Sequence, residues 1–263
     1  RAAPKRESRS AQRGGKFSER AGPLPSANPA ARCAEGNPVT AQLDHLVVLA
    51  DTLAAGVAWC EARLGVTPAP GGRHALFGTH NRLLAIGSVE FPQAYLEIIA
   101  IDPDADAPQR TRWFDMDDAR LQQEVRQHGP RLIHWVARVP ELAQATAALA
   151  ARGIDRGECL QASRMTPRGL LQWRIAVRPD GQRLFGGCLP TLIEWGAVHP
   201  AAALPASGIA LHALRLQHPE AARLQAALHA CGLTDIGVTP AAAPGIEAVL
   251  HTPRGPVVLS STL

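Results

Sequence analysis

The chain has 263 residues, of which 46% are hydrophobic and only 4% aromatic, so it is long enough for one large domain or two small ones. It contains no apolar run of about 18 residues or more, and we therefore expect neither a transmembrane helix nor a membrane partner. The five cysteines are scattered without a Cys-x-x-Cys pair, which favours free thiols in a reducing, cytoplasmic compartment over a disulfide framework.

The positive charge is concentrated at the start of the chain. Residues 1–41 carry a net charge of +5 and the whole chain carries +4, so residues 42–263 carry −1. The basic segment is rich in Arg, Ser, Ala, Pro and Gly, and we expect it to be a disordered tail. An organellar transit peptide has a similar composition, and that alternative stays open. For the folded part we expect no nucleic-acid partner.

A first module is predicted over residues 42–130, including its connection to the next. Residues 43–49 have the composition of a buried strand, and a helix over residues 53–64 follows, with Gly65 as a typical C-cap. The Pro- and Gly-rich segment 68–72 predicts a turn. Three strands are expected next, and a short helix within the polar connection, at residues 74–77, 81–86, 94–101 and 118–128.

A second module, residues 131–205, repeats this order. A strand at 131–138 is followed by a helix over 140–152 that begins at Pro140, a favoured first helical residue. Three strands are expected at residues 158–163, 170–177 and 190–195. The repeated order predicts an α+β fold in which βαβββ modules form curved mixed sheets around a central cup.

The remaining residues, 206–263, predict a third, shortened βαββ unit packed on the same domain. A strand at 209–216 and a helix at 219–231 are followed by a hairpin of residues 246–251 and 256–260.

Each of the first two modules carries one histidine on its first strand and one glutamate on its last. Glu97 lies 52 residues after His45, and Glu194 lies 60 residues after His134. An ionised glutamate in an apolar strand is costly to bury unless it is paired or bound to a cation. We therefore predict a mixed nitrogen and oxygen site for Zn, Fe, Mn, Ni or Co, with these four residues as ligands.

Structural roles compete with this interpretation. His45 could be a hydrogen-bonded core histidine, and Glu97 could face solvent on a half-exposed strand. Glu194 could pair with an arginine such as Arg174.

A second group of polar residues follows the predicted turn at Gly78. His80, Asn81 and Arg82 are predicted to contact a substrate at the mouth of the cup, with His80 as an acid or base. The Gly-Thr and Asn residues of this segment are equally typical of a turn without any function.

Several of these segments resemble the vicinal oxygen chelate superfamily, which includes glyoxalase I and extradiol dioxygenases. The opening strand 43–48 and the closing strand Tyr95-Leu96-Glu97 are similar to its first and last module strands. Segments 78–83, 190–195 and His199-Pro200 resemble its glyoxalase-like domain group. The resemblance covers roughly residues 42–200, and more weakly the residues up to 263.

This resemblance implies a metal-dependent lyase, isomerase or dioxygenase that acts on a small oxygen-chelating substrate. His45, Glu97, His134 and Glu194 would hold the metal, and Glu194 or His80 would move the proton. A homodimer is one expected assembly. The alternative is a metal-free protein that binds or sequesters a small molecule in the same cup.

Overall fold

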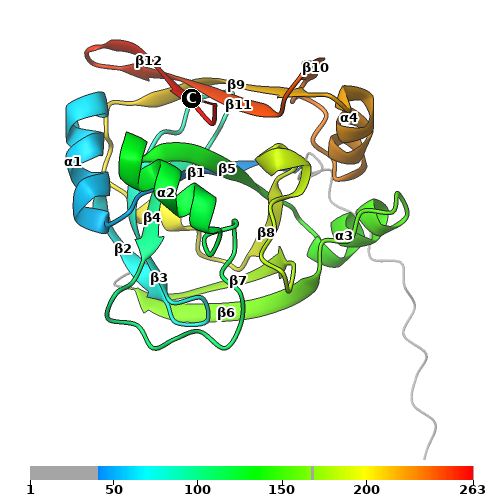
Figure 1. Ribbon diagram of the computed structural model, residues 1–263, viewed down its shortest axis with the longest axis horizontal. Coiled ribbons are helices and arrows are strands. Elements are labelled where there is room, and N and C mark those ends of the chain that lie inside the picture. Colours follow the sequence, from blue (N-terminus) through cyan, green and yellow to red (C-terminus); the bar gives the residue numbers. More distant parts are fainter. Residues whose placement is uncertain (1–40, 167–168, 263) are drawn as a thin grey trace, which may run out of the picture. The chain divides into compact units, whose positions relative to one another are not determined.

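Two modules with the same order of elements build one eight-stranded mixed sheet in the computed structural model, which describes residues 41–166 and 169–262 (Figure 1). Nearly all of the predicted basic tail lies outside the described residues. The first module consists of β1 (Gln42–Leu49), α1 (Leu53–Leu64), β2 (Ala69–His74), β3 (Thr79–Ala85) and β4 (Tyr95–Ile101). The second consists of β5 (Arg131–Arg138), α3 (Leu142–Ala150), β6 (Glu158–Thr166), β7 (Gly169–Val177) and β8 (Thr191–Trp195), and the connecting helix is α2 (Ala119–His128).

The first strands of the two modules lie side by side at the centre of the sheet. The strand order is β2-β3-β4-β1-β5-β8-β7-β6, with β1 parallel to β4, β5 parallel to β8, and β1 antiparallel to β5. The sheet curls strongly into a half-barrel (Figure 1). The predicted α+β fold with repeated βαβββ modules around a cup is therefore confirmed.

The third unit forms a separate four-stranded sheet. It consists of β9 (Ala210–His218), α4 (Ala221–Ala230), β10 (Val238–Pro240), β11 (Gly245–Thr252) and β12 (Gly255–Ser260), in the order β10-β9-β11-β12. The predicted hairpin is confirmed as β11 and β12. Strand β10 has only three residues and was not predicted. The first strand pairs with β10 and β11 rather than with the last strand, so the topology differs from that of the two modules.

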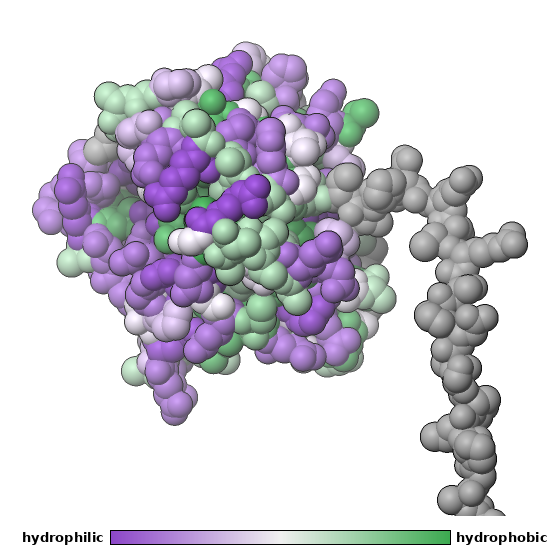
Figure 2. Space-filling model, turned by 90° about the vertical axis from the view of Figure 1, so that its right-hand side faces the viewer, coloured by the Kyte–Doolittle hydropathy of each residue, from purple (hydrophilic) through white to green (hydrophobic). Residues whose placement is uncertain are grey.

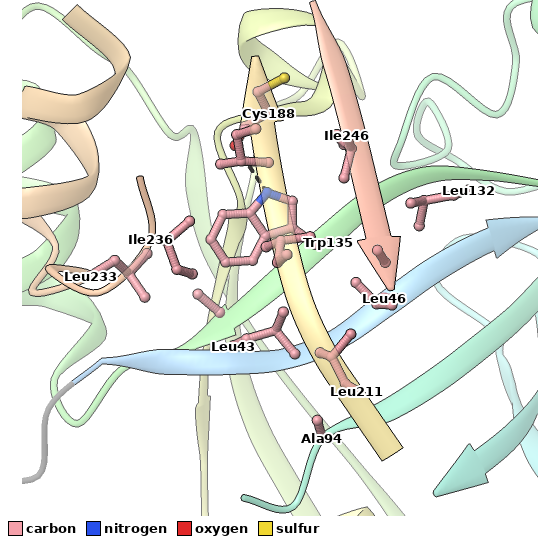
Figure 3. Packing of buried hydrophobic residues seen from close by; sticks show 14 of the residues in the cluster. Leu43, Leu46, Ala94, Leu132, Trp135, Cys188, Leu211, Leu233, Ile236 and Ile246 are labelled. Carbon is pink, nitrogen blue, oxygen red and sulfur yellow. Dashed lines mark hydrogen bonds between the residues drawn. The ribbon is translucent and has the colours of Figure 1, made fainter. Parts of the chain in front are cut away.

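Alternating side chains divide the core between the two faces of the large sheet. On the convex face, Leu46 and Trp135 pack with residues of α1, α3, α4 and the second sheet. Figure 3 shows Trp135 among Leu211, Ile246 and Ile236, with its indole N–H donating to the carbonyl of Cys188 at 2.9 Å. On the concave face, which we call the cup, a second cluster includes aromatic residues from the module connection.

The strand predicted at residues 74–77 was wrong, because β2 ends at His74 and residues 75–78 form a turn. Two further boundaries also differ from the prediction. The segment 69–72, predicted as a turn, belongs to β2, because β2 is an edge strand where Pro70 needs no ladder hydrogen bond. Helix α3 begins at Leu142 rather than Pro140, and its N-cap residue Glu141 makes no side-chain cap. The carboxylate of Glu194 accepts a hydrogen bond from Leu142 N instead, at 2.8 Å.

The outer surface is mixed in character. Figure 2 shows hydrophilic residues over most of one face, with smaller apolar patches between them. None of the described helices is both long enough and apolar enough to cross a membrane.

The packing of α1 on the sheet depends on a small residue, which gives a test of the convex core. A Cβ atom at Gly56 would overlap Cγ2 of Ile98 in β4. We expect Gly56→Ala to lower the free energy of unfolding by about 1–3 kcal/mol, measured by urea denaturation, because the helix must move away from the sheet. The exposed Ala58→Ser is the control and should change stability by less than about 0.5 kcal/mol. Equal stability of the two variants would contradict the close contact.

Candidate functional site

The cup holds a small cavity of about 40 Å³ between the two modules. Its polar lining comes from both halves of the sheet, and the remainder is aromatic and aliphatic. The polar residues are His45, His74, Asn81, Glu97 and Arg164, and the aromatic residues are Tyr95, Trp113, Phe114, Trp173 and Trp195. Of the residues predicted from the sequence, the structure brings His45, Glu97 and Asn81 together in this cavity.

His45 lies between two carboxylates. Its Nδ1 donates to Asp44 Oδ1 at 2.7 Å, and its Nε2 lies 3.5 Å from Glu97 Oε2. The ring stacks on Tyr95, with the ring centroids 4.5 Å apart. Burial alone would lower the pKa of His45, but the hydrogen bonds and charges of Asp44 and Glu97 outweigh it and raise the pKa from 6.5 to about 9. The imidazole is therefore cationic at neutral pH.

Asp44 organises one wall of the cup. Its carboxylate is fully buried, and besides His45 it accepts hydrogen bonds from Trp195 Nε1 at 2.9 Å and from His199 Nε2 at 2.8 Å. Burial opposes the charge of Asp44, but these partners hold its pKa well below its usual value. A register shift in β1 between Leu43 and His45 accounts for this arrangement, because a bulge re-aims neighbouring side chains.

Glu97 is held from its other side by amide and imidazole groups. Asn81 Nδ2 donates to Glu97 Oε1 at 2.6 Å, and the same amide lies 3.4 Å from His74 Nε2. Burial would raise the pKa of Glu97, but the contacts with His45, His74 and Asn81 lower it. Burial also lowers the pKa of His74 to about 4, so that ring is neutral. Glu97 is thus an ionised base beside a cationic histidine.

His134 faces the same side of the sheet, but both of its ring nitrogens are already bonded. Nδ1 donates to the carbonyl of Gly187 at 2.9 Å, since a carbonyl can only accept. The lone pair of Nε2 accepts from Thr191 N at 3.2 Å and lies 3.0 Å from Thr191 Oγ1. Burial and the charges of Arg183 and Arg156 keep the pKa of His134 well below its usual value.

Glu194 lies outside the cup. On β8 the side chains of Ile193 and Trp195 line the cavity, so the residue between them points to the convex face. There its carboxylate pairs with Arg174, with one Nη2 contact of 2.6 Å, and caps α3. The prediction of Glu194 as ligand and catalytic residue therefore needs correction, and the competing pairing with Arg174 is confirmed. The neighbouring Trp195 lies in the cup.

His80 and Arg82 lie on the face of β3 opposite to Asn81, so neither stands at the mouth of the cup as predicted. His80 lines a different groove, of about 430 Å³, between the start of α1 and α2. Its Nδ1 is 3.7 Å from Asp102 Oδ1. Alternation along the strand explains why only one of three consecutive polar residues reaches the cup.

The residues present do not fit the predicted four-ligand metal site. A metal ligand must offer a lone pair, and the only acceptor nitrogen of His134 is occupied by Thr191. Glu194 is on the other face of the sheet. Within residues 41–166 and 169–262, no three His, Cys, Asp or Glu side chains group as a metal site. Only His45 and Glu97 remain adjacent, and they bind each other.

Comparison with known protein families gives one match. A family model described as "Glyoxalase-like domain" matches residues 43–232. The chain belongs to the glyoxalase-like domain family. This places it in the vicinal oxygen chelate superfamily, as its motifs suggested, and the match extends through β9 and α4. A search of curated proteins found no match.

Several solved structures are similar to this chain at low sequence identity. A hypothetical protein from Staphylococcus aureus is 12% identical, with a TM-score of 0.52, over 78% of this chain and 88% of that one. Methylmalonyl-CoA epimerase from Streptomyces coelicolor is 15% identical, with a TM-score of 0.37, over 61% of this chain and 98% of that one. A mutant 4-hydroxymandelate synthase from Streptomyces coelicolor is 13% identical, with a TM-score of 0.40, over 84% and 62%. The first supports the fold alone, and the other two are too distant to carry an argument.

Sequence reasoning missed several residues of the site. Asp44 adjoins His45 in the sequence, and an acid in an apolar strand was a usable signal, but it received no role. His199 was noticed only as part of a resemblance. His74 and Arg164 carry no local signal, because only the curling of the sheet brings β2 and β6 to the cup.

The raised pKa of His45 predicts how stability depends on pH. A histidine with a folded-state pKa of about 9 and an ordinary value of 6.5 binds more protons when folded, so its contribution is complete below 6.5 and is lost as the pH rises through 9. Unfolding free energy should therefore fall across this window, by at most about 3 kcal/mol. Histidines with lowered pKa, such as His74, act below this window. His45→Gln should remove the fall and the exposed His128→Gln should keep it. An unchanged profile in His45→Gln would contradict the assignment.

Proposed function

We propose that this glyoxalase-like domain is an enzyme that transfers a proton next to a carbonyl group of a small organic substrate bound in the cup, as isomerases and lyases do. The observation that carries the proposal is the buried pair of a cationic His45 and an ionised Glu97, 3.5 Å apart, on the wall of the small cavity in the cup. Such a pair supplies an acid and a base whose pKa values are moved apart by their surroundings.

His45 supports the role of acid. Its Nδ1–H is committed to Asp44, which leaves Nε2–H directed toward Glu97 and the cavity. The 3.5 Å contact is long for a hydrogen bond, so a substrate oxygen can compete for this proton. A cation beside a carbonyl oxygen stabilises the negative charge that develops when a neighbouring C–H bond loses its proton.

Glu97 supports the role of base. It is ionised at neutral pH, and Asn81 fixes one of its oxygens while the other faces His45. Asn81 is itself fixed, because Gly72 N donates to its Oδ1 at 2.7 Å. A carboxylate held in one orientation can take a proton from a carbon without rearrangement of the site. His45 and Glu97 are each only 5% exposed, and a charge interaction shielded from water is stronger than one in bulk water.

The proposal assigns no step to a divalent metal, because Glu194 and the lone pair of His134 are committed elsewhere. The predicted ring-cleaving dioxygenase is therefore not part of it. We expect the purified protein to hold sub-stoichiometric divalent metal, and His134→Ala to leave that amount unchanged, as measured by plasma mass spectrometry. One metal per chain that is lost in His134→Ala would contradict this account.

Proton transfer can be tested without knowledge of the natural substrate. In D₂O, the protein should accelerate exchange of the hydrogens beside the carbonyl in members of a panel of 2-oxo acids and 2-hydroxy ketones, followed by proton NMR. Glu97→Gln should lose about 100-fold or more of this acceleration, because an amide is no base. His45→Gln should lose a similar amount.

The matched control is Glu194→Gln. Glu194 lies in the last strand of the second module, as Glu97 does in the first, but its carboxylate is on the convex face. Per folded molecule, this variant should accelerate exchange of the substrate hydrogens as much as the wild type does. Exchange that is equal in Glu97→Gln and the wild type would overturn the proposal. Tight binding of panel members with no exchange by the wild type would favour the alternative of a binding or sequestering protein.

A further inference from the structure

The two edges of the large sheet meet at one residue. Strands β2 and β6 are at opposite ends of the strand order, but the curl of the sheet brings them together. Arg164 of β6 reaches across to β2, where a Cβ atom at Gly72 would overlap its Nη1. We call this meeting line of β2 and β6 the seam. A glycine at position 72 is what leaves room for the guanidinium.

Arg164 separates two hollows. It lines the cavity of about 40 Å³ in the cup, and it also lines an outer groove of about 680 Å³ that runs along the seam. Leu83, Leu171 and Pro200 are likewise shared by both hollows. A rotation of the Arg164 side chain would join them, which makes the seam the natural entrance to the cup.

The charge of Arg164 has no carboxylate partner in the described part of the chain. Its Nε is buried and makes no hydrogen bond there, and it forms no ion pair among those residues. Other arginines of the domain do pair, as Arg174 does with Glu194 and Arg183 with Asp115. A buried guanidinium N–H without an acceptor is costly, so a ligand that supplies an acceptor would be favoured.

The space behind Arg164 is lined by rings. Tyr95, Trp113 and Phe114 come from the first module and its connection, and Trp173 and Trp195 come from the second. Trp173 and Trp195 lie with their ring centroids 5.7 Å apart. Aromatic walls favour a planar apolar group through offset or edge-to-face contacts.

We infer that Arg164 is the anion-recognising residue of the cup, and that it binds the carboxylate of a small aromatic acid whose ring enters through the seam. The inference rests on the proposed function in that it uses the same cup. The guanidinium fork matches a carboxylate in two-point geometry, and the carboxylate would remain at the seam while the ring lies among the aromatic side chains of the cup. The ligand would turn Arg164 outward, because the present cavity is too small for a ring.

Three probes distinguish the contribution of the carboxylate to binding from that of the aromatic ring. They are phenylacetate, its neutral analogue phenylacetamide, and acetate, which lacks the ring. We expect phenylacetate to bind the wild type at least about tenfold more tightly than either of the others, as measured by titration calorimetry and tryptophan fluorescence. In Arg164→Met the two phenyl compounds should bind within about twofold of each other. Arg164→Lys should recover only part of the preference, because it keeps the charge without the fork.

Gly72→Ala gives a second, independent variant. It keeps the arginine but displaces the guanidinium, and it should reduce the preference for phenylacetate several-fold. Arg120→Met is the control, since Arg120 is 88% exposed on α2, and it should bind like the wild type. Melting temperatures show whether each variant is folded.

The inference is overturned if phenylacetamide binds the wild type as tightly as phenylacetate, if acetate does so, if none of the probes binds, or if folded Arg164→Met keeps the preference. These results are distinct from failure of the proposed function, which would appear as hydrogen exchange that is equally fast in Glu97→Gln and the wild type. A Glu97→Gln variant that retains the phenylacetate preference would show that recognition and chemistry reside in different residues.

Discussion

The candidate site depends on one buried carboxylate. Asp44 is fully buried in the central strand of the sheet and accepts hydrogen bonds from His45, Trp195 and His199. Burying a carboxylate costs free energy unless its oxygens accept hydrogen bonds. The hydrogen bonds to Asp44 fix three side chains, which come from β1, β8 and the segment after β8. The consequence is that His45 is cationic and correctly oriented toward Glu97. The same contact links the two modules, because the first supplies the acid and the second supplies the indole.

The curvature of the sheet decides which residues reach the cup. Each module supplies half of the curved sheet, and the antiparallel pairing of β1 with β5 joins the two halves. The second sheet and three helices cover the convex face, so Trp135 and its neighbours supply the packing energy away from the site. The concave face carries the candidate site together with a second, smaller core cluster, and Arg164 lies where the outer strands meet. The larger core cluster and the candidate site therefore occupy opposite faces of the same strands.

Much of the fold could be predicted from sequence, because strand and helix periodicities differ and the element order repeats. His45 and Glu97 were found because each is a polar residue in an apolar strand, and Asn81 because it belongs to the polar group that follows the turn at Gly78. Glu194 is likewise a charged residue in an apolar strand, but Thr191, Leu192 and Ile193 are buried on both faces of β8, so the strand sequence does not show which face its carboxylate takes. The pairing register also shifts between Val47 and Val48, where Ile133 of β5 is an extra residue next to His134. Arg164 could not be predicted from the sequence, because its proposed role depends on a contact between β2 and β6, which are far apart in the chain.

In this structure His45 is an imidazolium held by two carboxylates, a state in which it offers no lone pair to a metal. Nitrogen NMR of the ring at pH 7.5, before and after one equivalent of Zn²⁺, tests this most directly. We expect both ring nitrogens to be protonated, and their signals not to move when Zn²⁺ is added. A neutral ring whose Nε2 signal shifts with stoichiometric Zn²⁺ would contradict it.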